Sequence, residues 1–171
     1  MKPAAFRHHQ PKSVAEAVSL LAEFASEDGR ILAGGQSLVP TMAFRMARPG
    51  HLIDINNIPE LSSISIEGDV LKIGACVRHV ALEGKEIPGP TGKILITVAH
   101  NIAHYPIRTR GTFGGSLANA DPASEWCCLV VALGGQLLLS SKEGERRILA
   151  SDFFRGIMTT AIRDEELLVG C

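Results

Sequence analysis

The sequence has no paired-cysteine motif. Its four cysteines, Cys76, Cys127, Cys128 and Cys171, form no C-x-x-C pair, so an iron–sulfur or zinc framework is not expected. Cys127 and Cys128 lie in an apolar stretch and are expected to be reduced core residues. This cysteine usage favours a cytoplasmic setting.

Long hydrophobic runs and an excess of one charge are also missing. The most apolar stretch, Trp126–Leu139, is too short and too interrupted by glycine to span a bilayer, and Met1–Gln10 lacks the apolar core of a signal peptide. The chain carries 17 basic and 18 acidic residues, with one Trp, one Tyr and six Phe. Neither a basic surface nor a base-stacking platform for nucleic acid is therefore expected. At 171 residues and 46% hydrophobic composition, the chain suits one globular domain, or two small lobes that share a core.

Two glycine pairs are the most informative motifs present. The first lies in Ala33-Gly34-Gly35-Gln36-Ser37 and the second in Thr112-Phe113-Gly114-Gly115-Ser116. Glycine lets backbone N–H groups approach a ligand, and a run of such groups forms an anion site. Two such loops in one small chain suggest a long diphosphate ligand held by both, as the pyrophosphate of FAD would require. We therefore expect both loops to face one cleft.

Each glycine pair also has a plainer interpretation. A Gly-Gly step after a strand is more often a simple turn. Neither pair matches the Rossmann or P-loop fingerprint. The acidic residues beside the second loop, Asp121 and Glu125, either form a solvated face or accept hydrogen bonds from ribose or ribityl hydroxyls. Arg108 and Arg110 either meet a diphosphate or form surface salt bridges.

A possible metal motif, His100-Asn101-Ile102-Ala103-His104, places two histidines four residues apart on a predicted helix. That spacing suits a metal. However, Asn101 stands where the H-E-x-x-H motif has its glutamate, and no third ligand is evident. A structural histidine pair, or one histidine near a ligand, is therefore expected rather than a bound metal.

The predicted elements change in character near residue 55. Residues 1–55 predict helix, strand, glycine loop, helix and strand, a βαβ-like unit that begins with the capping-box pattern Ser13-Val14-Ala15-Glu16. Residues 56–171 predict a hairpin around Glu67-Gly68-Asp69, a loop at Pro88-Gly89-Pro90 and several helices. A second hairpin around Lys142–Glu145 and a final strand at Glu166–Val169 follow. This organisation predicts an α+β fold with two lobes, 1–55 and 56–171.

The glycine loops in context resemble the FAD-binding medium subunit of molybdenum hydroxylases, the group of carbon monoxide dehydrogenase and xanthine dehydrogenase. The resemblance rests on three segments, which are Ile31–Pro40, Leu52–Ile55 and Ile107–Pro122. It implies a vanillyl-alcohol-oxidase-type FAD-binding fold, with a small N-terminal lobe around a parallel sheet and a larger lobe with an antiparallel sheet. It also implies a family C-terminal domain that would begin about where this chain stops, at Cys171.

The resemblance implies a set of residues that bind FAD. In the first loop and its flank these are Ala33, Gly34, Gly35, Gln36, Ser37 and Leu38. Around the second loop they are Ile102, Thr112, Gly114, Gly115, Ser116, Asp121 and Glu125. His104 and Arg110 are weaker candidates. Catalytic residues and metal ligands are not implied.

The function implied by the resemblance is electron transfer. In the family, a large molybdopterin-binding subunit oxidises the substrate and a small iron–sulfur subunit passes the electrons to the flavin. The flavin then reduces an external acceptor, which the sequence does not identify. The alternative is a truncated binding or assembly module that keeps the fold but has lost stable flavin.

Overall fold

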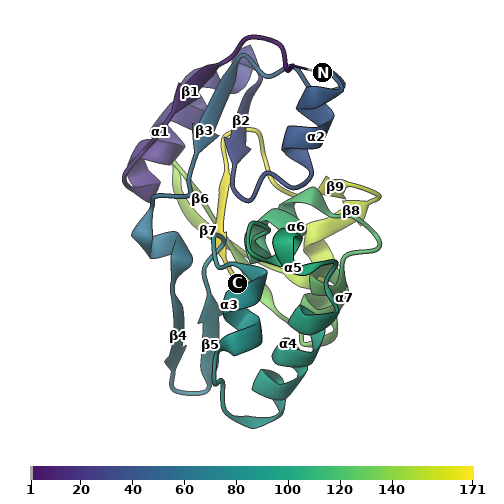
Figure 1. Cartoon of the computed structure of the whole chain (residues 1–171). Coiled ribbons are helices and arrows are strands. Elements are labelled where there is room, and N and C mark those ends of the chain that lie inside the picture. The colour runs from purple at the N-terminus through teal and green to yellow at the C-terminus, as the bar shows by residue number, and fades with distance from the viewer. Residues whose placement is uncertain (1) are drawn as a thin grey trace.

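A small parallel sheet begins the fold, in the upper part of Figure 1. Its strands are β1 (Arg7–His9), β2 (Gly29–Leu32) and β3 (His51–Asp54), in the spatial order β1-β3-β2. Both strand pairs are parallel. Helix α1 (Val14–Phe24) connects β1 to β2, and α2 (Leu38–Ala43) connects β2 to β3. The predicted βαβ-like unit is therefore confirmed, and β1 is a strand that the sequence analysis missed.

The capping box predicts the start of α1 correctly. The Ser13 hydroxyl accepts a hydrogen bond from the Glu16 backbone N–H at 3.2 Å, which satisfies one unpaired donor of the first turn. Ala17, Val18 and Leu21 are buried at helical spacing and pack against the parallel sheet. The amphipathic pattern thus fixes which face of α1 covers the sheet.

The remaining chain adds helices and antiparallel strands, and the structure describes residues 2–171 in all. The hairpin strands β4 (Ile64–Glu67) and β5 (Val70–Ile73) pair as the sequence predicts. Strands β6 (Gln136–Ser141), β7 (Gly144–Leu149) and β10 (Leu167–Gly170) form a three-stranded antiparallel sheet in the order β10-β6-β7.

Short helices and two further strands complete the chain. The helices are η1 (Ala25–Glu27), η2 (Pro59–Ser62), α3 (His79–Gly84), α4 (Gly89–Asn101), α5 (Tyr105–Arg108), α6 (Phe113–Asn119), α7 (Glu125–Ala132) and α8 (Ala150–Phe153). The strands are β8 (Phe154–Gly156) and β9 (Thr159–Thr160).

Two hydrophobic clusters form the core. The larger is built around Trp126, Phe113 and Phe153, which are almost completely buried. The smaller lies between α1 and the parallel sheet and also includes Leu61 and Leu167. The predicted α+β fold is confirmed, with one three-stranded parallel sheet and one three-stranded antiparallel sheet. The division into lobes at residues 55 and 56 stays a prediction, because the smaller cluster draws residues from both sides of it.

Two local expectations about helices are wrong. Pro88-Gly89-Pro90 was expected to be a loop, but α4 begins at Gly89 with proline in its first turn, where the missing N–H costs nothing. The helix expected to carry both His100 and His104 ends at Asn101, and Ala103 has φ +42°. His104 instead precedes α5. The two histidines therefore do not share a helix face.

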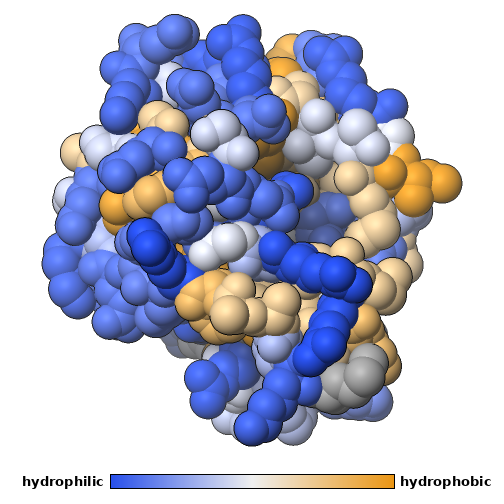
Figure 2. All heavy atoms as spheres, turned by 90° about the horizontal axis from the view of Figure 1, so that it is seen from above, coloured by the Kyte–Doolittle hydropathy of each residue, from blue (hydrophilic) through white to orange (hydrophobic). Residues whose placement is uncertain are grey.

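The surface seen from above, at the end that carries the parallel sheet, is mainly hydrophilic (Figure 2). Hydrophobic residues gather there in small groups between polar ones. Among residues 2–171, no helix has both the length and the apolarity needed to cross a bilayer.

Candidate functional site

A cleft of about 820 Å³ lies where the two glycine loops meet. Its walls come from β2 and the loop after it, from α6, and from the chain before β10. Apart from the two weaker candidates, the cleft is lined by all the residues that the sequence analysis assigned to FAD: Ala33, Gly34, Gly35, Gln36, Ser37, Leu38, Ile102, Thr112, Gly114, Gly115, Ser116, Asp121 and Glu125. The expectation that both glycine loops face one cleft is thus confirmed, whereas their roles in binding stay a prediction.

The first glycine loop, Ala33–Leu38, lines the cleft and leaves its backbone donors unpaired. Within residues 2–171, none of its six backbone N–H groups donates a hydrogen bond. Two of its carbonyl groups do accept hydrogen bonds: Asn56 Nδ2 donates to the Ala33 oxygen at 2.8 Å, and Gln36 Nε2 donates to the Gly34 oxygen at 3.2 Å. Successive unpaired N–H groups in a concave loop form an anion-binding site.

The second glycine loop, Thr112–Ser116, differs, because the protein already uses its donors. The Phe113 N–H donates to Val77 O at 2.8 Å and the Gly114 N–H donates to Ala75 O at 2.9 Å. The Gly115 N–H donates to the Thr112 hydroxyl at 3.1 Å, which caps α6. The two loops therefore differ in the backbone donors that they leave unpaired. The role of the second loop in binding an anion stays a prediction.

Gly34 and Gly114 both lie directly against the backbone of another segment of the protein. A Cβ on Gly34 would lie 2.5 Å from Arg110 O, and one on Gly114 would lie 2.6 Å from the Ala75 Cα. Real Cβ atoms essentially never make contacts this short. Gly34 thus lets the first loop rest directly against the chain that leads into the second. Gly35, with φ +71°, is the residue that turns the first loop.

Arg78 connects the segments around the two loops through hydrogen bonds. The Arg78 guanidinium donates to Arg110 O and, at 2.6 Å, to Asn56 Oδ1. Asn56 in turn donates to Ala33 O, and its Nδ2 also donates to Asp54 Oδ1 at 2.6 Å. A continuous hydrogen-bond path therefore runs from the first glycine loop to Arg110, two residues before the second loop. Neither Arg78 nor Asn56 carries a motif by which sequence reasoning would have found it.

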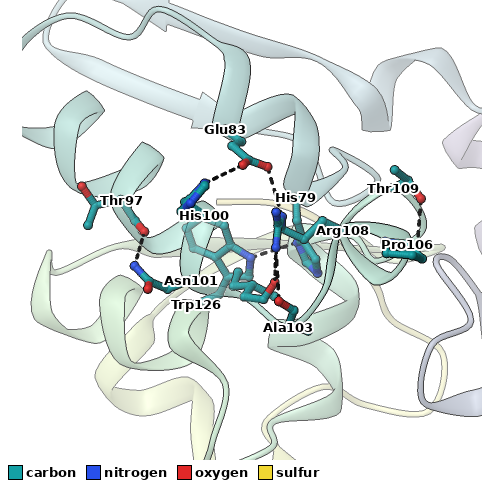
Figure 3. Close-up of polar contacts among 11 residues, drawn as sticks. His79, Glu83, Thr97, His100, Asn101, Ala103, Pro106, Arg108, Thr109 and Trp126 are labelled. Atoms are coloured by element: carbon teal, nitrogen blue, oxygen red, sulfur yellow. Dashed lines mark hydrogen bonds and ion pairs between the residues drawn. The ribbon is translucent and has the colours of Figure 1, made fainter.

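The arginines and histidines near the second loop have structural roles. Arg108 is buried and donates to Glu83 at 3.1 Å, to Ile102 O at 3.1 Å and to Ala103 O at 3.2 Å (Figure 3). His100 bonds the same Glu83 at 2.7 Å. The hydrogen bond from His100, followed by that from Arg108, lowers the pKa of the Glu83 carboxyl below its ordinary value. Arg108 thus holds the turn beside Ile102, and it is not among the residues that line the cleft.

His104 and Arg110, the weaker candidates, do not line the cleft either. Among residues 2–171, no cluster of three His, Cys, Asp or Glu side chains is close enough to hold a metal ion. The cleft also has walls that the sequence analysis missed. They come from segments without a recognisable motif, and include Arg30, Ala75, His79, Thr160, Arg163 and Asp164.

Asp121 and Glu125 lie on the cleft, one on each side of the turn between α6 and α7. Asp121 Oδ1 accepts the Ala123 N–H at 2.9 Å, which fixes the turn. Glu125 is the first residue of α7 and is exposed. Carboxylates are acceptors only, so these two suit hydroxyl groups rather than phosphate. The cleft thus combines donors for an anion with acceptors for a polyol, which fits the diphosphate and the hydroxyls of FAD.

Comparison with protein families gives one match along nearly the whole chain. Residues 4–171 match the family described as the FAD-binding domain in molybdopterin dehydrogenase. The caffeine dehydrogenase subunit beta of Pseudomonas sp. (strain CBB1) is 44% identical over 98% of this chain and 57% of its own length. The carbon monoxide dehydrogenase medium chain of Hydrogenophaga pseudoflava is 40% identical over 99% of this chain and 58% of its own.

Solved structures agree with this match. The structure of reconstituted CO dehydrogenase from Oligotropha carboxidovorans superposes on 99% of this chain with a TM-score of 0.95 and 40% identity. This chain spans 59% of that chain. The chain therefore spans somewhat more than half the length of the relatives it matches.

Proposed function

The chain belongs to the family of FAD-binding domains in molybdopterin dehydrogenases, and on that premise we propose that it binds FAD in the cleft between its two glycine loops. We further propose that the protein serves as the electron-transfer flavoprotein of a molybdenum hydroxylase. The six backbone N–H groups of Ala33–Leu38, which have no partner within residues 2–171, carry the proposal. They would hold a diphosphate without help from Arg78 and Arg108, whose guanidinium groups are already bonded to other groups.

Each part of the cleft has a role toward FAD. The first loop holds the diphosphate, and the hydroxyls of Ser37 and Ser116 donate to phosphate oxygens. Asp121 and Glu125 accept hydrogen bonds from the ribose or ribityl hydroxyls. Ile102, which is buried at the cleft wall, packs against the flavin ring or its linker.

The bound flavin supplies the chemistry, because flavins exchange either one electron or two. The protein places the flavin and excludes water from part of it. The partners are a molybdopterin-binding large subunit and an iron–sulfur small subunit, as the names and the family of the relatives suggest. The external acceptor is left unassigned.

The test is a titration of the purified chain with FAD and with FMN, followed by flavin fluorescence. FAD should bind more tightly, because FMN lacks the diphosphate that the first loop holds. Glu125→Gln should weaken FAD binding about fivefold, the effect of one hydrogen bond. Glu143→Gln, at an exposed hairpin turn away from the cleft, is the matched control. Equal affinity for FMN and FAD would refute the diphosphate site, and no flavin binding at all would favour the alternative of a binding or assembly module.

A further inference from the structure

His79 is a buried polar residue that none of the roles above explains. It is the first residue of α3 and only 3% exposed. Its Nδ1 accepts a hydrogen bond of 3.0 Å from Trp126 Nε1 (Figure 3). Its backbone N–H donates to Gly111 O. The ring is therefore held in one orientation by a helix, a core tryptophan and the chain that leads into the second glycine loop.

These contacts decide where the ring carries its hydrogen. The indole N–H of Trp126 is only a donor, so Nδ1 of His79 must be the acceptor. In the neutral ring the hydrogen then lies on Nε2. Burial, followed by the positive charges of Arg78 and Arg108, lowers the pKa of His79 from 6.5 to about 4. At neutral pH His79 is thus an uncharged ring with a fixed Nε2–H donor.

The Nε2–H group has no partner in the protein. Within residues 2–171 no hydrogen bond involves this nitrogen, yet no fully buried side-chain nitrogen or oxygen there lacks a partner. Nε2 is therefore not fully buried, and His79 lines the cleft. The lack of a side chain at Gly111 leaves room beside this nitrogen, because a Cβ at position 111 would lie 2.5 Å from Nε2. An ordered donor on a residue that lines a cleft is suited to bind an acceptor atom of a ligand.

The surroundings indicate which part of the ligand is bound. Ile102, Ala103 and Ile107 line the cleft together with His79 and Gly111. Such walls suit a flat, largely apolar ring system rather than a charged group. The diphosphate already has the donors of the first loop, and a neutral imidazole cannot balance its charge.

We propose that His79 donates a hydrogen bond from Nε2 to an acceptor atom of the flavin ring. This inference rests on the proposed binding of FAD. His79 would thereby fix the ring end of the ligand, while the first loop fixes the diphosphate. The donor is set before binding, because Trp126 selects the tautomer, and a preorganised donor loses little freedom on binding.

The test uses the wild-type chain labelled with ¹⁵N in its histidines. NMR follows the Nε2–H signal of His79 during titration with FAD and, separately, with ADP, which carries the diphosphate and adenosine but no flavin ring. FAD should shift the signal to lower field, and ADP should leave it nearly unchanged. A bound FAD that does not move the signal would overturn the role of His79 while leaving FAD binding intact. An equal shift with ADP would place His79 at the other end of the ligand, and a lack of FAD binding would overturn both proposals.

Two variants supply a second readout. His79→Phe removes the donor and should weaken FAD binding about tenfold, without changing the affinity for ADP. His79→Gln keeps an acceptor for Trp126 and a donor for the ligand, and should restore affinity to within about threefold. The free energy of unfolding of each variant separates a loss of fold from a loss of binding. An equal loss of FAD and ADP affinity in His79→Phe would contradict the proposal.

Discussion

Gly34 and Gly111 are in backbone contact: a Cβ on Gly34 would lie 2.8 Å from the Gly111 Cα. The first glycine loop thus rests on the chain that leads into the second. The width of the cleft between the loops is consequently set by packing within the protein, before any ligand binds.

This contact predicts that Gly34→Val is primarily a folding variant. The new side chain would collide with Arg110 O and Gly111, and overpacking of this kind costs about 2–3 kcal/mol. Urea unfolding without ligand should show the loss. Gly156→Val is the control, because a Cβ at Gly156 meets no atom within 4 Å. A Gly34→Val protein with wild-type stability that merely failed to bind FAD would contradict this interpretation.

The two glycine loops should behave differently in hydrogen exchange. The amides of Ala33–Leu38 have no acceptor within residues 2–171 and should exchange rapidly in the free protein. FAD should slow their exchange and shift their NMR signals. The amides of Phe113, Gly114 and Gly115 are already bonded and should be protected with or without FAD. Protection of the first loop in the free protein would mean that its donors are not available to a ligand.

Arg78→Lys should weaken FAD binding by separating the loops. A lysine cannot reach Arg110 O and Asn56 Oδ1 with the planar fork of an arginine. We expect FAD affinity to fall about tenfold, the effect of one to two hydrogen bonds. The control is Arg110→Lys, since Arg78 binds the backbone carbonyl of Arg110 and not its side chain.

The loss in Arg78→Lys should also be coupled to Asn56. Arg78→Lys combined with Asn56→Ala should cost less than the sum of the two single variants, because both changes break one path. Additive effects on FAD affinity in this double-mutant cycle would show that the two residues act separately.

The hydrogen bonds of the Glu166 carboxylate predict that the free energy of unfolding falls at acidic pH. Its buried carboxylate accepts from Arg146 Nη2 at 2.8 Å and from the Arg163 N–H at 2.8 Å. The hydrogen bond from Arg146 lowers the pKa of Glu166 below 4.5 in the folded state. A carboxyl with a lowered folded pKa stabilises the protein above its unfolded pKa, and this stabilisation disappears as the pH falls through the folded pKa.

Glu166→Gln should therefore destabilise the protein at pH 7 by about 2 kcal/mol, because Arg146 loses its ionic partner. The difference from wild type should shrink as the pH falls below about 4.5. Urea unfolding at a series of pH values measures both curves. A difference that stays constant down to pH 3 would show that the Glu166 charge does not contribute.

Local patterns in the sequence determined much of the fold. The capping box at Ser13 fixed the start of α1, and the hairpin signals at Glu67-Gly68-Asp69 and Lys142–Glu145 marked antiparallel pairs. Such signals act over a few residues, so they need no knowledge of the rest of the chain. The glycine loops, read together, also predicted one shared cleft.

Only the tertiary structure decided which backbone donors of the two loops are already bonded within the protein. The sequence presents two similar Gly-Gly pairs, but the donors of the second are used by Ala75 and Val77, whose carbonyls come from another segment. The roles of Arg78 and His79 likewise depend on partners far along the chain, at Asn56, Arg110 and Trp126. Hydrogen-bond partners of this kind are set by packing between distant segments, and no local pattern encodes them.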